Sequence, residues 1–147
     1  MGGHQMDWTV FKKGVYLVNL LGIIYNPKTK MILIGKRIND PNLKELSWVF
    51  PGGRPDYKND LSDNVQYEIK ENTGLDVVVK EIVFAKTYPE KREFLSIYYY
   101  CEFDTANSVE KASGNLKELK WIKPTEVTKY FTTSIHPKIL DYLNNLK

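Results

Sequence analysis

The stretch that decides the fold is Trp48-Val49-Phe50-Pro51-Gly52-Gly53-Arg54, together with the helix-like run over residues 61–74. Two successive glycines permit a tight turn and a close backbone approach. Within the run, Glu68 and Glu71 are three positions apart, which separates them by about 60° around a helix axis. Mg²⁺ prefers carboxylate oxygens, with substrate phosphate and water completing its shell. The pattern indicates a cation held over a polyphosphate, although paired glutamates can also simply solvate a helix face.

Strand and helix signals continue on both sides of this stretch. Residues 15–25 and 31–35 are rich in β-formers and flank turn residues at 26–30, which predicts a hairpin. Ser62 is the expected N-cap of the helix and Gly74 the glycine that ends it. Further strands are predicted over residues 77–88, 94–103 and 116–122, loops over 39–45 and 104–115, a helical turn from Pro124, and a last helix over 137–146 with Pro137 at its first position.

The composition describes one domain that binds a small molecule. The chain has 147 residues, of which 42% are hydrophobic and 27% charged, enough for one core. Its net charge of +3 comes from Lys and Arg scattered among Asp and Glu, so a nucleic-acid partner is not expected and a small anionic ligand is. We expect residues 1–5 to be a cloning remnant and residues 6–147 to form a single domain.

The location of the protein is predicted from its one cysteine and its apolar runs. Cys101 excludes an internal disulfide and a cysteine-built zinc site, which fits a reducing compartment, and we expect a cytoplasmic protein. Its place in an aromatic strand favours a buried apolar role over a nucleophilic one. No apolar run reaches the length of a membrane span, and residues 1–6 lack the features of a signal peptide.

The spacing around the two glutamates resembles a known motif. Gly53, five residues, Asn59, seven residues and then residues 67–75 resemble the Nudix box of the Nudix hydrolases. That box reads Gly, five residues, Glu, seven residues, Arg-Glu-aliphatic-x-Glu-Glu-x-Gly-aliphatic, and every spacing matches without a gap. Three positions depart from it. Asn59 and Asn72 stand where the family has glutamates, and Tyr67 where it has arginine, which removes charge and charge-assisted hydrogen bonds from the site.

The resemblance implies a fold, a cofactor and an activity. The implied fold is α/β, a Nudix-type α/β/α sandwich with a mixed sheet in a single domain. The implied activity is hydrolysis of a nucleoside diphosphate linked to another group, in which Mg²⁺, or Mn²⁺, orients the phosphates while a base activates water. The metal ligands that the resemblance implies are Gly53, Glu68, Glu71 and Asn72, and the catalytic residues are Glu68, Glu71 and Glu118. Glu118 could equally be an ordinary surface residue of its strand.

A second resemblance bears on the substrate. Residues 34–41 and 48–54 look like the GDP-mannose mannosyl hydrolase branch of the family, in which Arg37 and Arg54 would contact the diphosphate and Trp48 the substrate. Each arginine could instead be a surface residue at a strand end. That branch has a Gln-His pair where this chain has Leu116 and Lys117, so attack at the sugar carbon and attack at phosphorus both stay open.

Several residues have two interpretations. Tyrosines at 98–100 could pack in the core or stack on a base, and His136 could be a base or a helix cap. Asp56, Asp60 and Asp63 could assist the metal or remain solvated. The three departures also make a Nudix-fold module that binds a nucleotide or a protein without turnover an alternative to the enzyme. A homodimer is left open.

Overall fold

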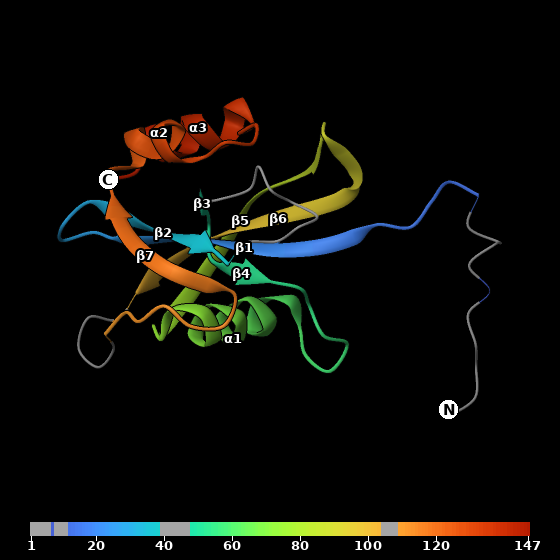
Figure 1. Ribbon diagram of the computed structural model, residues 1–147, viewed down its shortest axis with the longest axis horizontal. Helices are drawn as coiled ribbons and strands as arrows, with labels where there is room; N and C mark the ends of the chain where they lie inside the picture. The colour runs from blue at the N-terminus through green and yellow to red at the C-terminus, as the bar shows by residue number, and fades with distance from the viewer. Residues whose placement is uncertain (1–6, 8–11, 39–47, 104–108) are drawn as a thin grey trace.

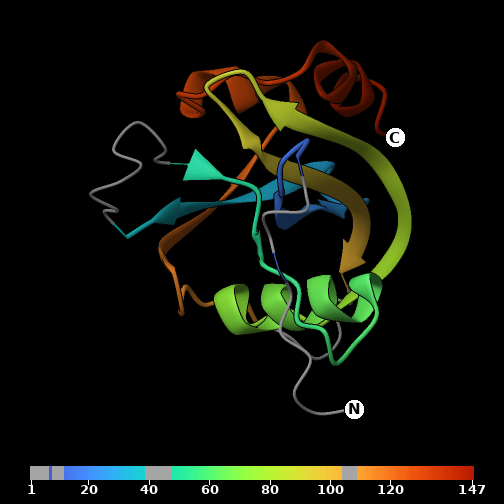
Figure 2. The same cartoon turned by 90° about the vertical axis from the view of Figure 1, so that its right-hand side faces the viewer.

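The computed structural model describes residues 7, 12–38, 48–103 and 109–147, and forms a three-layered sandwich. A seven-stranded sheet lies in the middle, with α1 against one face and α2 and α3 against the other (Figure 1). The view turned by 90° shows the same three layers (Figure 2). The predicted α/β sandwich with a mixed sheet is therefore confirmed.

The elements follow one another in the order that the sequence predicts. The strands are β1 (Leu17–Asn26), β2 (Met31–Arg37), β3 (Trp48–Val49), β4 (Gly52–Gly53), β5 (Val77–Tyr88), β6 (Lys91–Phe103) and β7 (Leu116–Ile122). The helices are α1 (Leu61–Thr73), α2 (Val127–Tyr130) and α3 (Pro137–Asn144), and a 3₁₀ turn, η2 (Pro124–Glu126), precedes α2. The loop expected over residues 39–45 and the first part of that over 104–115 lie outside the described residues, as do residues 1–6.

The hairpin of β1 and β2 opens away from its turn, and this opening positions the glycines. The two strands pair at Tyr25 with Ile32 and at Asn26 with Met31. Farther along, β2 pairs with β3 and β1 pairs with β4, all antiparallel. On its other edge β1 runs parallel to β6. Residues 48–53 thus fill the split in the hairpin, so Gly52 and Gly53 form a short strand and not the tight turn that the sequence suggests.

Two apolar layers hold the sandwich together. One lies between the sheet and α2 and α3, and the other between the sheet and α1. Alternate residues of β1 and β6 point to opposite layers, as a strand requires. The α1 layer is built around Leu20, Ile24, Leu33, Val65, Ile69, Leu75, Val77, Tyr99 and Cys101, and the opposite layer around Ile23, Tyr25, Ile32, Ile34, Phe50, Tyr98, Ile122, Val127, Ile139 and Leu143.

The N-terminal end of α1 is held by an asparagine and not by the predicted cap. The N-cap residue is Asp60, which makes no side-chain capping bond, and Ser62 lies inside the first turn. Buried Asn64 holds this end of the helix instead, because the loop before the helix folds back over its side chain. Its Nδ2 donates to the carbonyls of Asp56, Asn59 and Asp60, and its Oδ1 accepts from the Asp56 N–H. The prediction of Ser62 as the N-cap is wrong for this reason.

The C-terminal end of α1 is closed by Gly74 and by the loop before β7. Gly74 adopts the left-handed conformation with φ 74°, as predicted, and its N–H donates to the Lys70 carbonyl at 2.9 Å. Of the next three carbonyls, that of Glu71 accepts from the Ser113 hydroxyl, and those of Asn72 and Thr73 accept from the N–H groups of Ser113 and Lys111. The last turn therefore has its carbonyls satisfied, and residues 109–115 are fixed against the helix.

Two of the open alternatives are settled by this packing. Cys101 is fully buried, and this burial raises the pKa of its thiol to about 12, so its role is apolar. His136 is the N-cap of α3, where its Nδ1 accepts from the Lys138 N–H at 3.1 Å, and its ring lies against Phe84. Within the described residues, no helix is long and apolar enough to cross a membrane.

Candidate active site

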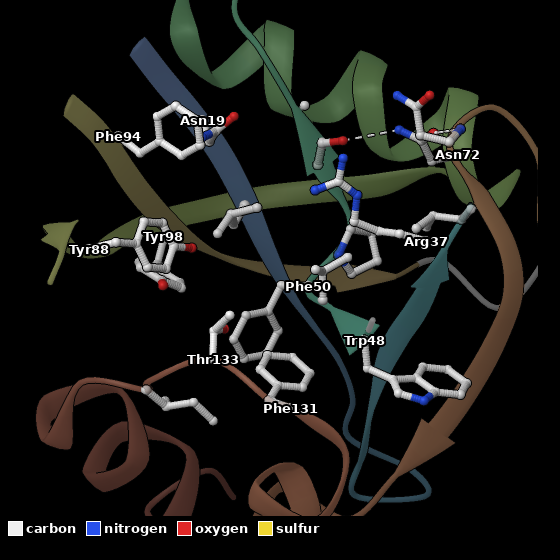
Figure 3. Close-up of a pocket in the computed structure, with 18 of the residues that line it drawn as sticks. Asn19, Arg37, Trp48, Phe50, Asn72, Tyr88, Phe94, Tyr98, Phe131 and Thr133 are labelled. Carbon is white, nitrogen blue, oxygen red and sulfur yellow. Dashed lines mark hydrogen bonds between the residues drawn. The ribbon is translucent and has the colours of Figure 1, made fainter. Parts of the chain in front are cut away.

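A cavity of about 980 Å³ lies beside the glycine strand and brings most of the predicted site residues together. Figure 3 shows Asn72 and Arg37 at one side of it, and Phe94 and Tyr88 at the other. We call the first side, which also carries Glu68, the acid end, and the second side the aromatic end. Of the predicted site residues, those that line the cavity are Arg37, Trp48, Gly53, Arg54, Glu68 and Asn72.

At the acid end, the carboxylate of Glu68 lies directly over Gly53. A Cβ atom built on Gly53 would clash with the carboxylate, so only glycine leaves the space for it. Glu68 is half-buried, and this burial, followed by the negative charge of Glu71, raises the pKa of its carboxyl. A cation placed between the two carboxylates would offset both the burial of the Glu68 charge and its repulsion by Glu71. The pair is therefore suited to holding a cation.

Glu71 is exposed on α1 and is not among the residues that line the cavity. Its carboxylate is within reach of the Tyr67 hydroxyl, one helical turn earlier, and its charge and this hydrogen bond are the main causes that raise the pKa of Tyr67. Tyr67 thus offers Glu71 a single neutral donor where the Nudix box has a charged guanidinium. Within the part of the chain that the structure describes, no three His, Cys, Asp or Glu side chains gather into a group that could hold a metal ion.

Asn72 faces the cavity from the same helix but is almost fully buried. Its Nδ2 donates to the carbonyl of Gly52 at 3.0 Å and to that of Glu68 at 2.9 Å. Its Oδ1 accepts from the N–H of Asn115 at 2.9 Å. The amide therefore bonds three segments of the chain at once, namely the glycine strand, the helix and the loop before β7.

Both arginines and Trp48 line the cavity, while their contact with a substrate stays a prediction. Arg37 comes from the end of β2 and reaches into the cavity near Asn72 (Figure 3), while Arg54 follows the glycine strand directly. The Trp48 ring packs edge-on against Tyr130, with centroids 5.7 Å apart, and Lys36 lies 5.9 Å from its centroid. Trp48 is therefore held in place by protein contacts as well as lining the cavity.

Glu118 and the three aspartates do not line the cavity. Glu118 is exposed on β7, opposite Lys36, on the sheet face that carries Ile122 and α2. Asp56 is exposed and its carboxylate accepts from the Lys58 N–H, which stabilises the loop before α1. Asp60 and Asp63 are also exposed. The structure thus brings Glu68 and Glu71 together and leaves Glu118 apart from them, while the catalytic role of each stays a prediction.

The aromatic end is made of residues that the sequence analysis largely missed. Phe50 packs edge-on against Tyr98 and Phe131, with ring centroids 5.9 and 4.9 Å apart. Phe94 and Tyr88 complete the aromatic wall. Burial raises the pKa of the Tyr98 hydroxyl, with a smaller contribution from Tyr88, so this hydroxyl is neutral at physiological pH. Of these residues the sequence analysis singled out Tyr98, as one of the tyrosines at 98–100, and quoted Phe50 only as part of the glycine stretch.

Polar side chains also line the aromatic end. The Asn19 amide projects from β1 beside Phe94 (Figure 3). Thr133 lies on the opposite wall, in the segment between α2 and α3. Asn19 lies near the start of β1 between apolar neighbours in sequence, so no local pattern marks it as a cavity residue. Its place in the cavity follows from the fold, in which β1 runs parallel to β6 and Asn19 lies opposite Ser96.

The turn between β5 and β6 is joined to the segment between α2 and α3 across the aromatic end. The Glu90 carboxylate accepts from the Ser134 N–H at 3.3 Å, and hydrogen bonding from Ser134 is the first cause that lowers the pKa of Glu90. Glu90, Lys91 and residues 131–135 all line the cavity. We call this contact the Glu90 clasp.

The fold and the acid end together define a Nudix domain. The family model for the NUDIX domain matches residues 15–143, and the chain belongs to this family. Among curated proteins, none matches the chain significantly in sequence.

Solved structures share the fold at low sequence identity. The MutT protein from Methanosarcina mazei Go1 is 20% identical with a TM-score of 0.69, over 90% of this chain and 95% of that one. A NUDIX hydrolase from Nitrosomonas europaea is 15% identical with a TM-score of 0.72, over 89% and 72%. A bifunctional NMN adenylyltransferase/ADP ribose pyrophosphatase from Francisella tularensis, complexed with AMP and a Mn ion, is 18% identical with a TM-score of 0.68, over 92% and 44%.

Proposed function

We propose that the protein is a metal-dependent hydrolase of a nucleoside diphosphate linked to another group. The observation that carries this proposal is that one cavity has Arg37, Arg54 and Glu68 at one end and an aromatic wall at the other. Guanidinium groups suit phosphates, and aromatic rings suit a nucleobase or another flat group. The cavity volume of about 980 Å³ is at the upper end of the usual range for small-molecule sites.

Glu68 and Glu71 are the residues that would hold Mg²⁺ or Mn²⁺ in this proposal, with the backbone of Gly53 beside them. The raised pKa of Glu68 supports this assignment, because two neighbouring carboxylates are costly to ionise together without a cation. When bound, the cation would neutralise the phosphates and lower the barrier to attack by water. One of the two glutamates would also orient that water, and Glu118 stays a candidate base only if the substrate reaches β7.

Arg37 and Arg54 would bind the diphosphate, and the aromatic end would bind the nucleoside. Trp48 would shape the wall between them. The names of the similar structures, MutT and ADP ribose pyrophosphatase, support nucleotides as the substrate class. A nucleotide sugar is a further candidate because of the resemblance around Arg37 and Arg54, and attack at phosphorus or at carbon would follow from which substrate is cleaved.

The test is a panel of nucleotide sugars, dinucleotides and nucleoside triphosphates, each assayed with Mg²⁺ or Mn²⁺ for released phosphate or sugar. Glu71→Gln should then lower kcat at least about a hundredfold while the melting temperature stays close to that of the wild type, because Glu71 is exposed and supports chemistry rather than the core. Equal kcat in the two proteins would contradict the catalytic assignment.

A binding module is the second candidate, and the absence of a three-carboxylate group among the described residues favours it. Such a module would bind a nucleotide in the same cavity without turnover. Binding measured by calorimetry, with no product from any member of the panel, would select this function over the enzyme. A cytoplasmic location and a homodimer are further proposals, which cell fractionation and light scattering would test.

A further inference from the structure

We infer that Asn72 is a positioning residue that assembles the acid end before any cation binds. The inference deepens the proposed function, on which its kinetic part rests. Asn72 joins β4, α1 and the loop before β7 through one side chain. A bound cation can join segments in the same way when each segment supplies it with a ligand. Here a neutral amide makes the connection, so the geometry of the end does not depend on metal.

The hydrogen bonds of Asn72 leave the amide little capacity for another role. An asparagine side chain has two N–H donors and one carbonyl acceptor. Both donors are used, on the carbonyls of Gly52 and Glu68, and the acceptor receives the N–H of Asn115. The residue is only 3% exposed, so these bonds are made in a largely dry environment. Each of the three bonds has the length of a good hydrogen bond.

Only an amide can make this set of bonds. A carboxylate at position 72 would have the right shape but no donors, so the Gly52 carbonyl would lose its partner and face a negative charge. The helix carbonyl of Glu68 would face the same charge, although its own intrahelical bond would remain. Asparagine at this position of the box is therefore matched to the backbone groups that surround it.

The bond to Gly52 bears directly on the predicted metal ligand Glu68. Gly52 precedes Gly53, and Gly53 is the surface on which the Glu68 carboxylate rests. The bond from Asn72 fixes the distance between β4 and α1 at this point, and with it the place of the carboxylate. The loop before β7 is held to the helix by the further bonds of Ser113 and Lys111, so Asn115 is brought to Asn72 by backbone contacts of its own.

The first test needs no activity. In ¹⁵N-labelled protein with EDTA, the side-chain N–H₂ of Asn72 should exchange with solvent at least about a hundredfold more slowly than that of exposed Asn59, and addition of Mg²⁺ should not change its rate. Exchange as fast as that of Asn59, or protection that develops only with Mg²⁺, would overturn the inference. If the hydrolase proposal fails, this measurement still decides the matter.

The second test compares the same chemical change at Asn72 and at an exposed asparagine outside the cavity. Asn72→Asp keeps the shape and removes both donors, and should lower kcat at least about tenfold with KM little changed, because the reacting groups lose their alignment while the rest of the cavity stays. Asn144→Asp is the matched control and should leave kcat and KM as they are, since its side chain is exposed on α3 and does not line the cavity. Unchanged kcat in a folded Asn72→Asp protein would overturn the inference.

Discussion

The two ends of the cavity differ in how the chain builds them. The acid end comes mainly from one continuous stretch, from Gly52 to Asn72, in which a strand and a helix are neighbours in sequence. The aromatic end is collected from four places, namely β1, the β5–β6 hairpin, Phe50 between β3 and β4, and the segment after α2. The first end is thus a local motif, and the second exists only in the folded sheet.

The forces that hold the two ends differ as well. At the acid end, polar groups are joined by directional hydrogen bonds, such as those of Asn64 and Asn72, which tolerate little change in residue type. At the aromatic end, Phe50, Tyr98 and Phe131 are held by ring contacts, which many side chains of similar size could replace. In the proposed function, the acid end holds the reacting groups and the aromatic end holds the nucleoside. We therefore expect changes at the acid end to alter kcat and changes at the aromatic end to alter KM.

The largest effects are expected from the two adjacent glycines of the acid end. A Cβ on Gly52 would meet the backbone carbonyl of Leu20, which cannot move without breaking β1. Gly52→Ala should therefore destabilise the fold by about 3 kcal/mol, as overpacking does in cores. The atoms nearest to a Cβ on Gly53 all belong to the Glu68 side chain, which can turn away. Gly53→Ala should leave the fold stable and lower kcat about tenfold.

Urea unfolding of both variants, with steady-state kinetics on Gly53→Ala, checks this pair. The wild type serves as the reference for both measurements. If Gly53→Ala were as unstable as Gly52→Ala, or if it kept full kcat, the contact between Gly53 and the Glu68 carboxylate would have no functional meaning. The expectation that changes at the acid end alter kcat would then lose its support.

Much of the fold could be predicted from the sequence because its signals are local. The limits of β5 and β7, the helix over residues 61–73 and the glycine at 74 follow from β-formers, helical spacing and one left-handed residue. The N-cap at Ser62 was wrong, because Asn64 binds the preceding loop through four hydrogen bonds that no local rule describes. The split hairpin was equally hidden, since it depends on residues 48–53 pairing with two strands at once.

The site divides in the same way. Glu68 could be named from helical spacing, and Asn72, Arg37 and Arg54 from resemblance, because a motif fixes their separation along the chain. Asn19 and Phe131 had no such signal, because they meet only when the sheet forms. A motif also shows which residue stands at a position but not what it contacts, so the buried amide of Asn72 could not be foreseen.

At the aromatic end, Phe94 is the residue whose removal should weaken binding most. Its ring lines the cavity and is half-buried, with the Lys91 ammonium 5.1 Å from its centroid. Stacking of a base on an aromatic ring contributes about 1–3 kcal/mol, so Phe94→Ala should raise KM about tenfold with kcat little changed. Phe94→Tyr keeps the ring and is the control, with KM close to that of the wild type. A loss of kcat at constant KM in Phe94→Ala would contradict the separation of catalysis at the acid end from nucleoside binding at the aromatic end.

The smallest effect is expected from the Glu90 clasp. Glu90→Gln keeps the shape of the side chain but replaces a charged acceptor by a neutral one, which weakens the bond from the Ser134 N–H. The walls of the aromatic end should then be held less firmly, and KM should rise about twofold with kcat unchanged. Steady-state kinetics at pH 7 measures this change, and Glu93→Gln, an exposed change on β6 outside the cavity lining, is its control.

The pH dependence of the same variant gives the sharper test, because its sign is fixed. The pKa of Glu90 is lowered in the folded protein, first by hydrogen bonding from Ser134 and least by the charge of Lys86. A carboxyl with a lowered pKa contributes stability that is present above its unfolded pKa, about 4, and is lost as the pH falls through its folded pKa. Wild type should therefore melt at a higher temperature than Glu90→Gln at pH 7, and this difference should disappear in acid as Glu90 is protonated. A difference in melting temperature that is the same at both pH values would show that the Glu90 charge does not hold the two walls together.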